Sequence, residues 1–224
     1  MTARTKLKDR ILPTYTRGEE IFNMVSHIVG GGFGVVALVA CVLIAALSGN
    51  ALGVVCSAIF GVSMIVLYTA SSLYHGLTHE GAKKVFQILD QCTRYFLIAG
   101  TYTPMLLCSL IKVAPMAAML TLAAVWGLAI LATTLTAIDI KKYKVFSMIC
   151  YIGIGWAIIF SIRSMYAALT PAGFWLLLSG GIVYTVGAIL FKVGKHYRYF
   201  HSIFHLFVLA GSILHTLCIT LYVL

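Results

Sequence analysis

Charged residues are scarce in this chain of 224 residues, of which 10% are Asp, Glu, Lys or Arg and 61% are hydrophobic. A soluble domain has roughly 25% charged and about 45–50% apolar residues, so a water-soluble globular fold is excluded. No charged residue occurs between Glu20 and Glu80, a stretch too long for one membrane span of about 20 residues. The scarcity of charge therefore predicts an integral membrane protein that crosses the bilayer several times.

The sequence also lacks paired cysteines, internal repeats and polar linkers. Its six cysteines all fall inside apolar runs and none forms a CxxC pair, so we expect small packing residues, not disulfides or metal ligands. They are Cys41, Cys56, Cys92, Cys108, Cys150 and Cys218. The first apolar run is too long for a signal peptide and has no small-residue cleavage site, so we expect a retained helix.

The few charged residues divide the chain into apolar blocks that predict seven transmembrane helices. These helices are expected at 21–47, 52–74, 86–111, 114–137, 145–169, 172–192 and 200–223. We expect an all-α fold, a seven-helix transmembrane bundle over 19–224, with a short basic segment at 1–18. Pro104 predicts a kink in the third span, and the Gly30-Gly31-Gly32 run predicts close approach of helix backbones.

The basic residues alternate between loops in a way that predicts orientation. Thirteen Lys and Arg residues fall before span 1 or between spans 2 and 3, 4 and 5, or 6 and 7, against only Lys112 and Arg163 on the other side. Cytoplasmic loops carry the excess of Lys and Arg, so the N-terminus is predicted to be cytoplasmic and the C-terminus outside. This pattern, despite a net charge of +10, argues against nucleic acid and for contacts with anionic membrane lipids.

Polar side chains of four spans gather at one predicted depth, because span 2 ends and spans 1, 3 and 7 begin at the cytoplasmic side. Ionisable groups at membrane depth are costly and are usually functional, so this layer is the predicted site. Its residues are Glu19, Glu20, Asn23, Ser26 and His27 in span 1, Ser71 and His75 in span 2, Asp90 about one turn into span 3, and His201 and His205 in span 7.

His201 and His205 are the most informative pair, because four residues on a helix return a side chain to the same face. Two imidazoles placed in this way can bind one metal ion, usually zinc, and His75 is the predicted third ligand. Zinc with three protein ligands keeps a position for water and lowers the pKa of that water to about 7. Asp90 is then the predicted general base, and Ser71 is predicted to hold the water or stabilise an oxyanion.

Each site residue also has a structural interpretation that the sequence leaves open. The histidines can simply hydrogen-bond across helices. Asp90 can form an i,i+4 ion pair with Arg94, and Ser71 can bond to the backbone of its own helix.

The remaining histidines are expected to be less important. His27 and His215 are predicted to pack or to support the ligands, while His79 and His196 are expected in loops. Ser202 follows His201 where an HExxH metalloprotease has glutamate, so that class is excluded.

The ordered motifs of the chain resemble the hemolysin III family, bacterial relatives of the adiponectin and progestin receptors. The matching runs are Glu19-Glu20-Ile-Phe-Asn23-Met-Val-Ser26-His27, Ser71-Ser-Leu-Tyr-His75, Asp90 with Ile98-Ala-Gly-Thr-Tyr-Thr-Pro104, and His201-Ser-Ile-Phe-His205 continuing to His215. The long N-terminal domain of the receptors has no counterpart here, so we do not expect a hormone-receptor role.

The resemblance implies seven helices, a cytoplasmic N-terminus and location in the bacterial inner membrane. It also implies a zinc ion near the cytoplasmic side, held by histidines that match His75, His201 and His205. Asp90 matches the family aspartate that holds the zinc-bound water, and Ser71 matches the family serine. The wider superfamily includes alkaline ceramidases, which cleave the amide of a sphingolipid.

Four functions are compatible with these features. The first is a zinc-dependent hydrolase of a lipid amide or ester, with a lipid-like substrate. The second is a regulator of membrane lipid composition or fluidity with structural zinc, and the third is a hemolysin-like pore, which the absence of a soluble state disfavours. The fourth, a transporter, is disfavoured because an odd number of spans lacks a half-to-half repeat. Small-residue helix faces permit a homo-oligomer.

Overall fold

The computed structural model describes residues 5–194 and 197–224, and all regular structure in these residues is helical. Seven helical segments are long and apolar enough to cross a membrane, which confirms the predicted fold class and number of spans. Five are single α-helices, a sixth, α3, is extended by other helix types, and the seventh is broken. The segments are α1 (Arg17–Leu47), α2 (Ala51–Gly76), α3 (Glu80–Pro104) continued to Lys112, α4 (Pro115–Ile138), a broken segment Lys144–Ala168, α7 (Pro171–Val193) and α8 (Phe200–Tyr222).

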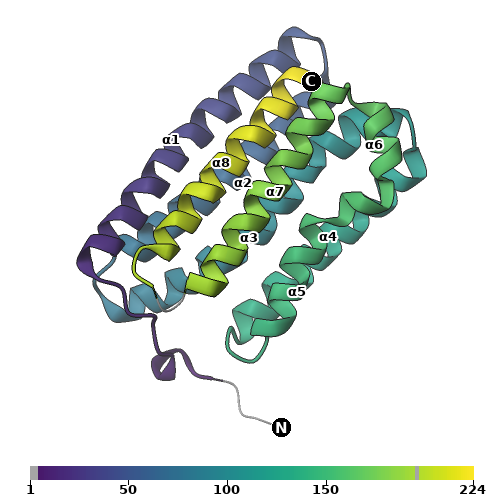
Figure 1. Ribbon diagram of the computed structural model, residues 1–224. Helices are drawn as coiled ribbons and strands as arrows, with labels where there is room; N and C mark the ends of the chain where they lie inside the picture. The colour runs from purple at the N-terminus through teal and green to yellow at the C-terminus, as the bar shows by residue number, and fades with distance from the viewer. Residues whose placement is uncertain (1–4, 195–196) are drawn as a thin grey trace.

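The helices form a bundle in which α8 packs between α1 and α7 (Figure 1). Helices α2 and α3 lie behind this row, where α2 packs on both α1 and α3, and α4 packs on α3. The segment before α1 and the last turn of α8 lie at opposite ends of the bundle, as an odd number of spans requires. Helices that are distant in sequence, α1 and α8, are therefore neighbours in space.

Two helices begin earlier than the apolar runs predict. A capping box starts α1 at Arg17, because the Thr16 hydroxyl accepts the Glu19 N–H and the Glu19 carboxylate accepts the Thr16 N–H, at 3.3 and 2.8 Å. The His79 ring caps α3 by accepting the Ala82 N–H at 3.2 Å, so α3 begins at Glu80 and not at 86.

The early start of α3 changes the position of Asp90 within its helix. This residue lies ten positions after Glu80, about 15 Å along the helix axis at 1.5 Å per residue, and not one turn from the start. The predicted start of this helix at 86 was wrong, because an apolar run marks the part of a helix in lipid, whereas polar caps determine where the helix begins.

Irregular helix types interrupt two spans. At Pro104 α3 gives way to a π-helical stretch, η2 (Met105–Ser109), and then to a 3₁₀ turn, η3 (Leu110–Lys112). The hydroxyls of Thr101 and Thr103 donate to carbonyls one turn earlier, at 2.7 and 2.8 Å, beside the proline.

The fifth span consists of α5 (Lys144–Gly155), a 3₁₀ stretch η4 (Ala157–Ser161) and α6 (Ile162–Ala168). The sequence analysis did not anticipate this break.

Candidate metal centre

His201 and His205 lie in the first two turns of α8, with their Nε2 atoms 3.0 Å apart. The helix starts at this place because Tyr199, its N-cap residue, adopts a left-handed conformation (φ 62°) and donates its N–H to Glu19 Oε1 at 2.7 Å. A carboxylate at the start of α1 therefore fixes the start of α8. The i,i+4 spacing brings the two rings to one face, as predicted.

His75 reaches the same point from the last turn of α2. Its Nε2 lies 3.2 Å from Nε2 of His201, and one nitrogen from each of the three rings lies within 4.8 Å of the others. We call His75, His201 and His205 the histidine group. The His205 and His75 side chains are buried and His201 is half-buried. The structure thus brings together all three predicted ligands, from two helices far apart in sequence.

The chemistry of the histidine group fits a metal ion. If the rings only bond to one another, one Nε2 atom of each adjacent pair must carry a proton. A neutral imidazole has only one N–H, on either Nδ1 or Nε2. The Nδ1 atom of His75 already bonds to Glu20 Oε2 at 2.6 Å, which places that proton on Nδ1 and leaves Nε2 as a free lone pair. Converging lone pairs of neutral imidazoles are the donor set that first-row divalent metals prefer.

Glu20 is a site residue to which sequence analysis gave no specific role. Besides His75, its carboxylate contacts Lys83, whose Nζ lies 2.7 Å from Glu20 Oε1. A carboxylate in the first turn of an apolar span, within the predicted polar layer, was the available signal. The sequence did not show that α1 lies beside the end of α2 in a register that pairs Glu20 with His75.

Asp90 is buried, and one of its carboxylate oxygens, Oδ2, accepts a hydrogen bond from Arg94 Nη2 four residues later. The ion pair that the sequence left open is therefore present. The guanidinium also lies 5.6 Å from the Phe204 ring of α8. The other oxygen, Oδ1, has no hydrogen-bond partner among the described residues, so Asp90 retains one acceptor for a further group.

Ser71 lies one turn before His75 on α2 and is fully buried. Its hydroxyl has no partner in the described part of the chain, whereas the neighbouring Ser72 donates to the Tyr68 carbonyl at 2.7 Å. The local backbone bond that the sequence allowed for Ser71 is thus made by Ser72 instead. Ser71 keeps a free donor near the histidine group.

Two further polar residues of α1 face the same region. The His27 ring stacks on His205, with centroids 3.7 Å apart and planes 22° apart. Asn23, one turn earlier, is fully buried, and neither its amide nor the His27 ring has a hydrogen-bond partner within residues 5–194 and 197–224. His27 therefore supports a predicted ligand by packing, which is the role the sequence suggested for it.

Two further histidines of the described residues lie outside this group. His215 faces α7, where its Nε2 lies 3.1 Å from the Leu177 carbonyl oxygen, and His79 caps α3. His196 falls outside the described residues. Neither the His215 ring nor the His79 ring is part of the histidine group.

The segment before α1 covers the histidine group. The Tyr15 ring stacks on His201, with centroids 5.0 Å apart, and meets His75 edge-on at 5.7 Å. Burial raises the pKa of the Tyr15 hydroxyl well above its usual value, so the ring stays neutral. Closer to the N-terminus of this segment, the Lys8 carbonyl accepts a hydrogen bond from Lys84 Nζ at 2.9 Å, which ties the segment to α3.

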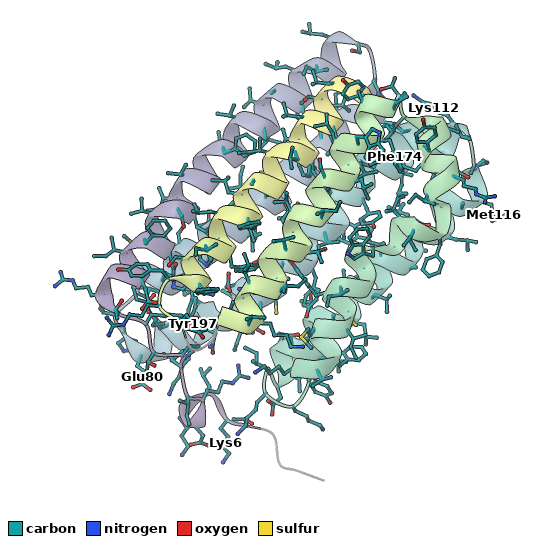
Figure 2. The ribbon with its side chains drawn as sticks, viewed as in Figure 1. Lys6, Glu80, Lys112, Met116, Phe174 and Tyr197 are labelled. Carbon is teal, nitrogen blue, oxygen red and sulfur yellow. The ribbon has the colours of Figure 1, made fainter. Side chains whose placement is uncertain are left out.

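The histidine group lies at the basic end of the bundle. Figure 2 shows Glu80 and Tyr197 at the same end as Lys6, with Lys112 and Met116 at the other end. His75 belongs to the helix end just before Glu80, and His201 to the helix start just after Tyr197. Two residues of the predicted polar layer, His75 and His201, therefore lie at this end of the bundle.

Comparisons with known proteins identify the family of the chain. The profile of the family described as "Haemolysin-III related" matches residues 15–216. The chain is 43% identical over 206 residues to "Hemolysin-3" of Bacillus cereus, and the match covers 92% of each chain. It is 39% identical over 211 residues to "Hemolysin-3 homolog" of Bacillus subtilis (strain 168), and that match covers 93% of this chain and 96% of the relative. It is 26% identical over 191 residues to the human "Monocyte to macrophage differentiation factor", covering 83% and 78% of the two chains. The chain therefore belongs to the haemolysin-III-related family, as its motifs predict.

Proposed function

We propose that this protein is a zinc-dependent hydrolase that cleaves an amide or ester bond of a membrane lipid. The observation that carries the proposal is the convergence of three Nε2 atoms, with that of His201 lying 3.2 Å from His75 and 3.0 Å from His205. A carboxylate, that of Glu20, lies 2.6 Å from Nδ1 of His75. His75, His201 and His205 would hold the ion. An ion held there would supply Lewis-acid chemistry, lowering the pKa of water to about 7 and polarising a carbonyl oxygen.

The residues around the histidine group have chemistry that suits hydrolysis. Arg94 occupies Oδ2 of Asp90 and leaves Oδ1 free to accept a proton. The Ser71 hydroxyl is free to donate to a developing oxyanion. Tyr15 covers the group and limits access of bulk water.

The substrate and the side of the membrane follow from location. The group is buried among helices that are apolar towards lipid, so a lipid reaches it more readily than a soluble molecule. The basic residues at this end favour the cytoplasm, and we propose the cytoplasmic membrane of a bacterium as the location. The carbonyl to be cleaved then lies near the inner leaflet headgroups.

A second candidate function is a non-enzymatic regulator of lipid composition or fluidity in which zinc joins α2 to α8. The Asp90–Arg94 ion pair favours it, because a carboxylate engaged in a structural pair need not act as a base. Both functions predict zinc and differ in whether lipid is turned over.

The first experiment is to measure metal content of the purified protein by elemental mass spectrometry, for wild type and for His201→Ala/His205→Ala. About one zinc per chain that is lost in the double variant supports the site, and a folded, metal-free wild type contradicts it.

Incubation of the zinc-loaded protein with N-acyl sphingoid lipids, followed by mass spectrometry of released fatty acid, then separates the two functions. Release by wild type supports the hydrolase, whereas its absence favours the regulator.

A further inference from the structure

Glu20 and His75 form the tightest polar contact of the histidine group. The Glu20 Oε2 to His75 Nδ1 distance is 2.6 Å, and the His75 side chain is completely buried. An ionised carboxylate only accepts hydrogen bonds, so Nδ1 must carry the proton. The carboxylate therefore sets both the tautomer and the orientation of the ring and directs the Nε2 lone pair towards His201.

The other two rings have no such partner. Nδ1 of His201 and Nδ1 of His205 are buried, and neither has a hydrogen-bond partner in the described part of the chain. Apart from the Nε2 contacts within the histidine group, these rings are oriented by packing, with Tyr15 on His201 and His27 on His205. His75 is thus the ligand whose tautomer is set by a specific neighbour.

Lys83 keeps the Glu20 carboxylate in place. Its Nζ lies 2.7 Å from Glu20 Oε1 and 3.3 Å from the Leu77 carbonyl oxygen, so one ammonium joins the carboxylate to the loop after α2. The Glu20 side chain is 19% exposed and Lys83 12%, which makes this pair less costly to keep charged than a fully buried one. The order of contacts is Lys83 to Glu20 to His75.

We infer that Glu20 is a positioning residue that raises the metal affinity of the histidine group by holding His75 in the ligand tautomer. The inference rests on the proposed function, because it requires that the histidine group binds zinc. It goes beyond that function by assigning to α1, which supplies no ligand, a share in metal retention. Carboxylates that hold a ligating histidine in this way typically contribute roughly 10–100-fold to metal affinity.

The test compares Glu20→Gln with wild type. Glutamine keeps the size of the side chain and one carbonyl acceptor, but it loses the charge that favours a proton on Nδ1. We expect zinc dissociation constants, measured by competition with a chromogenic chelator, to rise roughly 10–100-fold. The matched control is Glu80→Gln, because the exposed carboxylate of Glu80 lies at the same end of the bundle and pairs with Lys84. Its zinc dissociation constant is expected to equal that of wild type.

A second readout separates positioning from folding. Cobalt(II) replaces zinc and its visible absorption reports ligand geometry, so Glu20→Gln is expected to shift or weaken these bands while Glu80→Gln leaves them unchanged. The metal-free forms of wild type and Glu20→Gln are expected to unfold at the same temperature. A lower unfolding temperature of metal-free Glu20→Gln, with unchanged cobalt bands, would overturn the inference in favour of a structural role.

The inference and the proposed function fail in different ways. If wild type binds zinc and Glu20→Gln binds it equally tightly, the positioning role is wrong and the metal centre stands. If wild type binds neither zinc nor cobalt, the metal centre itself is wrong and the inference falls with it.

Discussion

The ring of Tyr15 lies stacked on the ring of His201, with centroids 5.0 Å apart and planes 22° apart. The two residues are 186 positions apart, and the contact closes the histidine group at the end of the bundle. Since Tyr15 donates no ligand atom, its effect on a bound metal should be kinetic. We therefore expect Tyr15→Ala to increase the rate at which zinc is lost to excess chelator by roughly tenfold. The zinc dissociation constant should change by less.

Two tyrosine variants control for this effect. Tyr15→Phe keeps the stacked ring and should release zinc at the wild-type rate. Tyr197→Ala removes an exposed tyrosine at the same end of the bundle and should have no effect. Equal release rates in Tyr15→Ala and wild type would show that the segment before α1 does not limit access.

The Asp90–Arg94 pair predicts separate effects on activity and on stability. Asp90→Asn should lower lipid hydrolysis roughly 100-fold or more, as expected for loss of a general base, while zinc content stays near one per chain. It should also destabilise the fold, because Arg94 keeps its charge without a partner. Adding Arg94→Met should restore the unfolding temperature but not the activity. Full activity in the double variant would assign Asp90 to structure alone.

Asp139 lies in the loop between α4 and α5, outside the membrane-spanning segments. We expect this residue to make the stability of the fold depend on pH. Backbone N–H groups of Thr5, Lys142 and Lys141 donate to its carboxylate, at 2.7, 3.1 and 3.0 Å, and lower its pKa to about 2. A lowered pKa contributes stability that is complete above the unfolded pKa of about 4 and is lost as the pH falls towards 2.

Asp139→Asn should therefore reduce stability by about 1 kcal/mol at pH 7 and by progressively less below pH 4. The segment before α1, which Thr5 ties to this loop, should become easier to cleave with trypsin at Lys6, Lys8 or Arg10. Unfolding midpoints across pH 2–7 and trypsin digestion at pH 7.5 measure the two effects. A difference from wild type that persists at pH 2 would contradict the assignment to this carboxylate.

Two neighbouring glycines provide a matched test of helix packing. A Cβ on Gly30 would lie 2.5 Å from the Tyr68 ring, a fully buried side chain whose hydroxyl bonds to Ser212 at 2.8 Å, whereas a Cβ on Gly32 would meet nothing within 4 Å. Gly30→Ala should destabilise the protein by about 1–3 kcal/mol through overpacking. Gly32→Ala should be neutral or stabilising, because alanine favours helix by up to about 1 kcal/mol. Thermal unfolding in detergent distinguishes them, and equal midpoints would contradict the close approach at Gly30.

The proposed orientation is testable with reporters that work on one side of the membrane. Alkaline phosphatase fused after Leu224 should be active, because it folds only outside the cytoplasm, and a fluorescent protein fused before Met1 should fluoresce. The reverse pattern would place the histidine group at the outer face and would remove the argument for an inner-leaflet substrate.

Hydropathy and charge predicted the seven spans and the polar layer, because an ionisable residue stands out in an apolar chain. The convergence of His75 with His201 and His205 was accessible for the same reason, since helix rise and an up-and-down topology place their ends together. Pairing between helices was less accessible. The contacts of Glu20 with His75 and of Glu19 with Tyr199 depend on α1 lying beside α2 and α8 in one register, which periodicity does not encode.

Local backbone detail was also missed where hydropathy is uniform. The break between Gly155 and Ile162 changes helix type without changing polarity, so the fifth block read as a single helix. The role of Tyr15 was missed because a tyrosine before an apolar run is typical of the membrane interface, and only the path of the chain brings it over His201.

All six thiols of the chain are buried, with exposed fractions from 0 to 7%, and none forms a disulfide. The native sequence is therefore a nearly silent background for reagents that react with thiols in water. One cysteine introduced at each of two exposed positions, such as Ser48 and Tyr197, can carry a spin label or a fluorophore without first deleting the native cysteines. Distances between labels at the two ends of the bundle are then measurable in a protein that keeps its original packing.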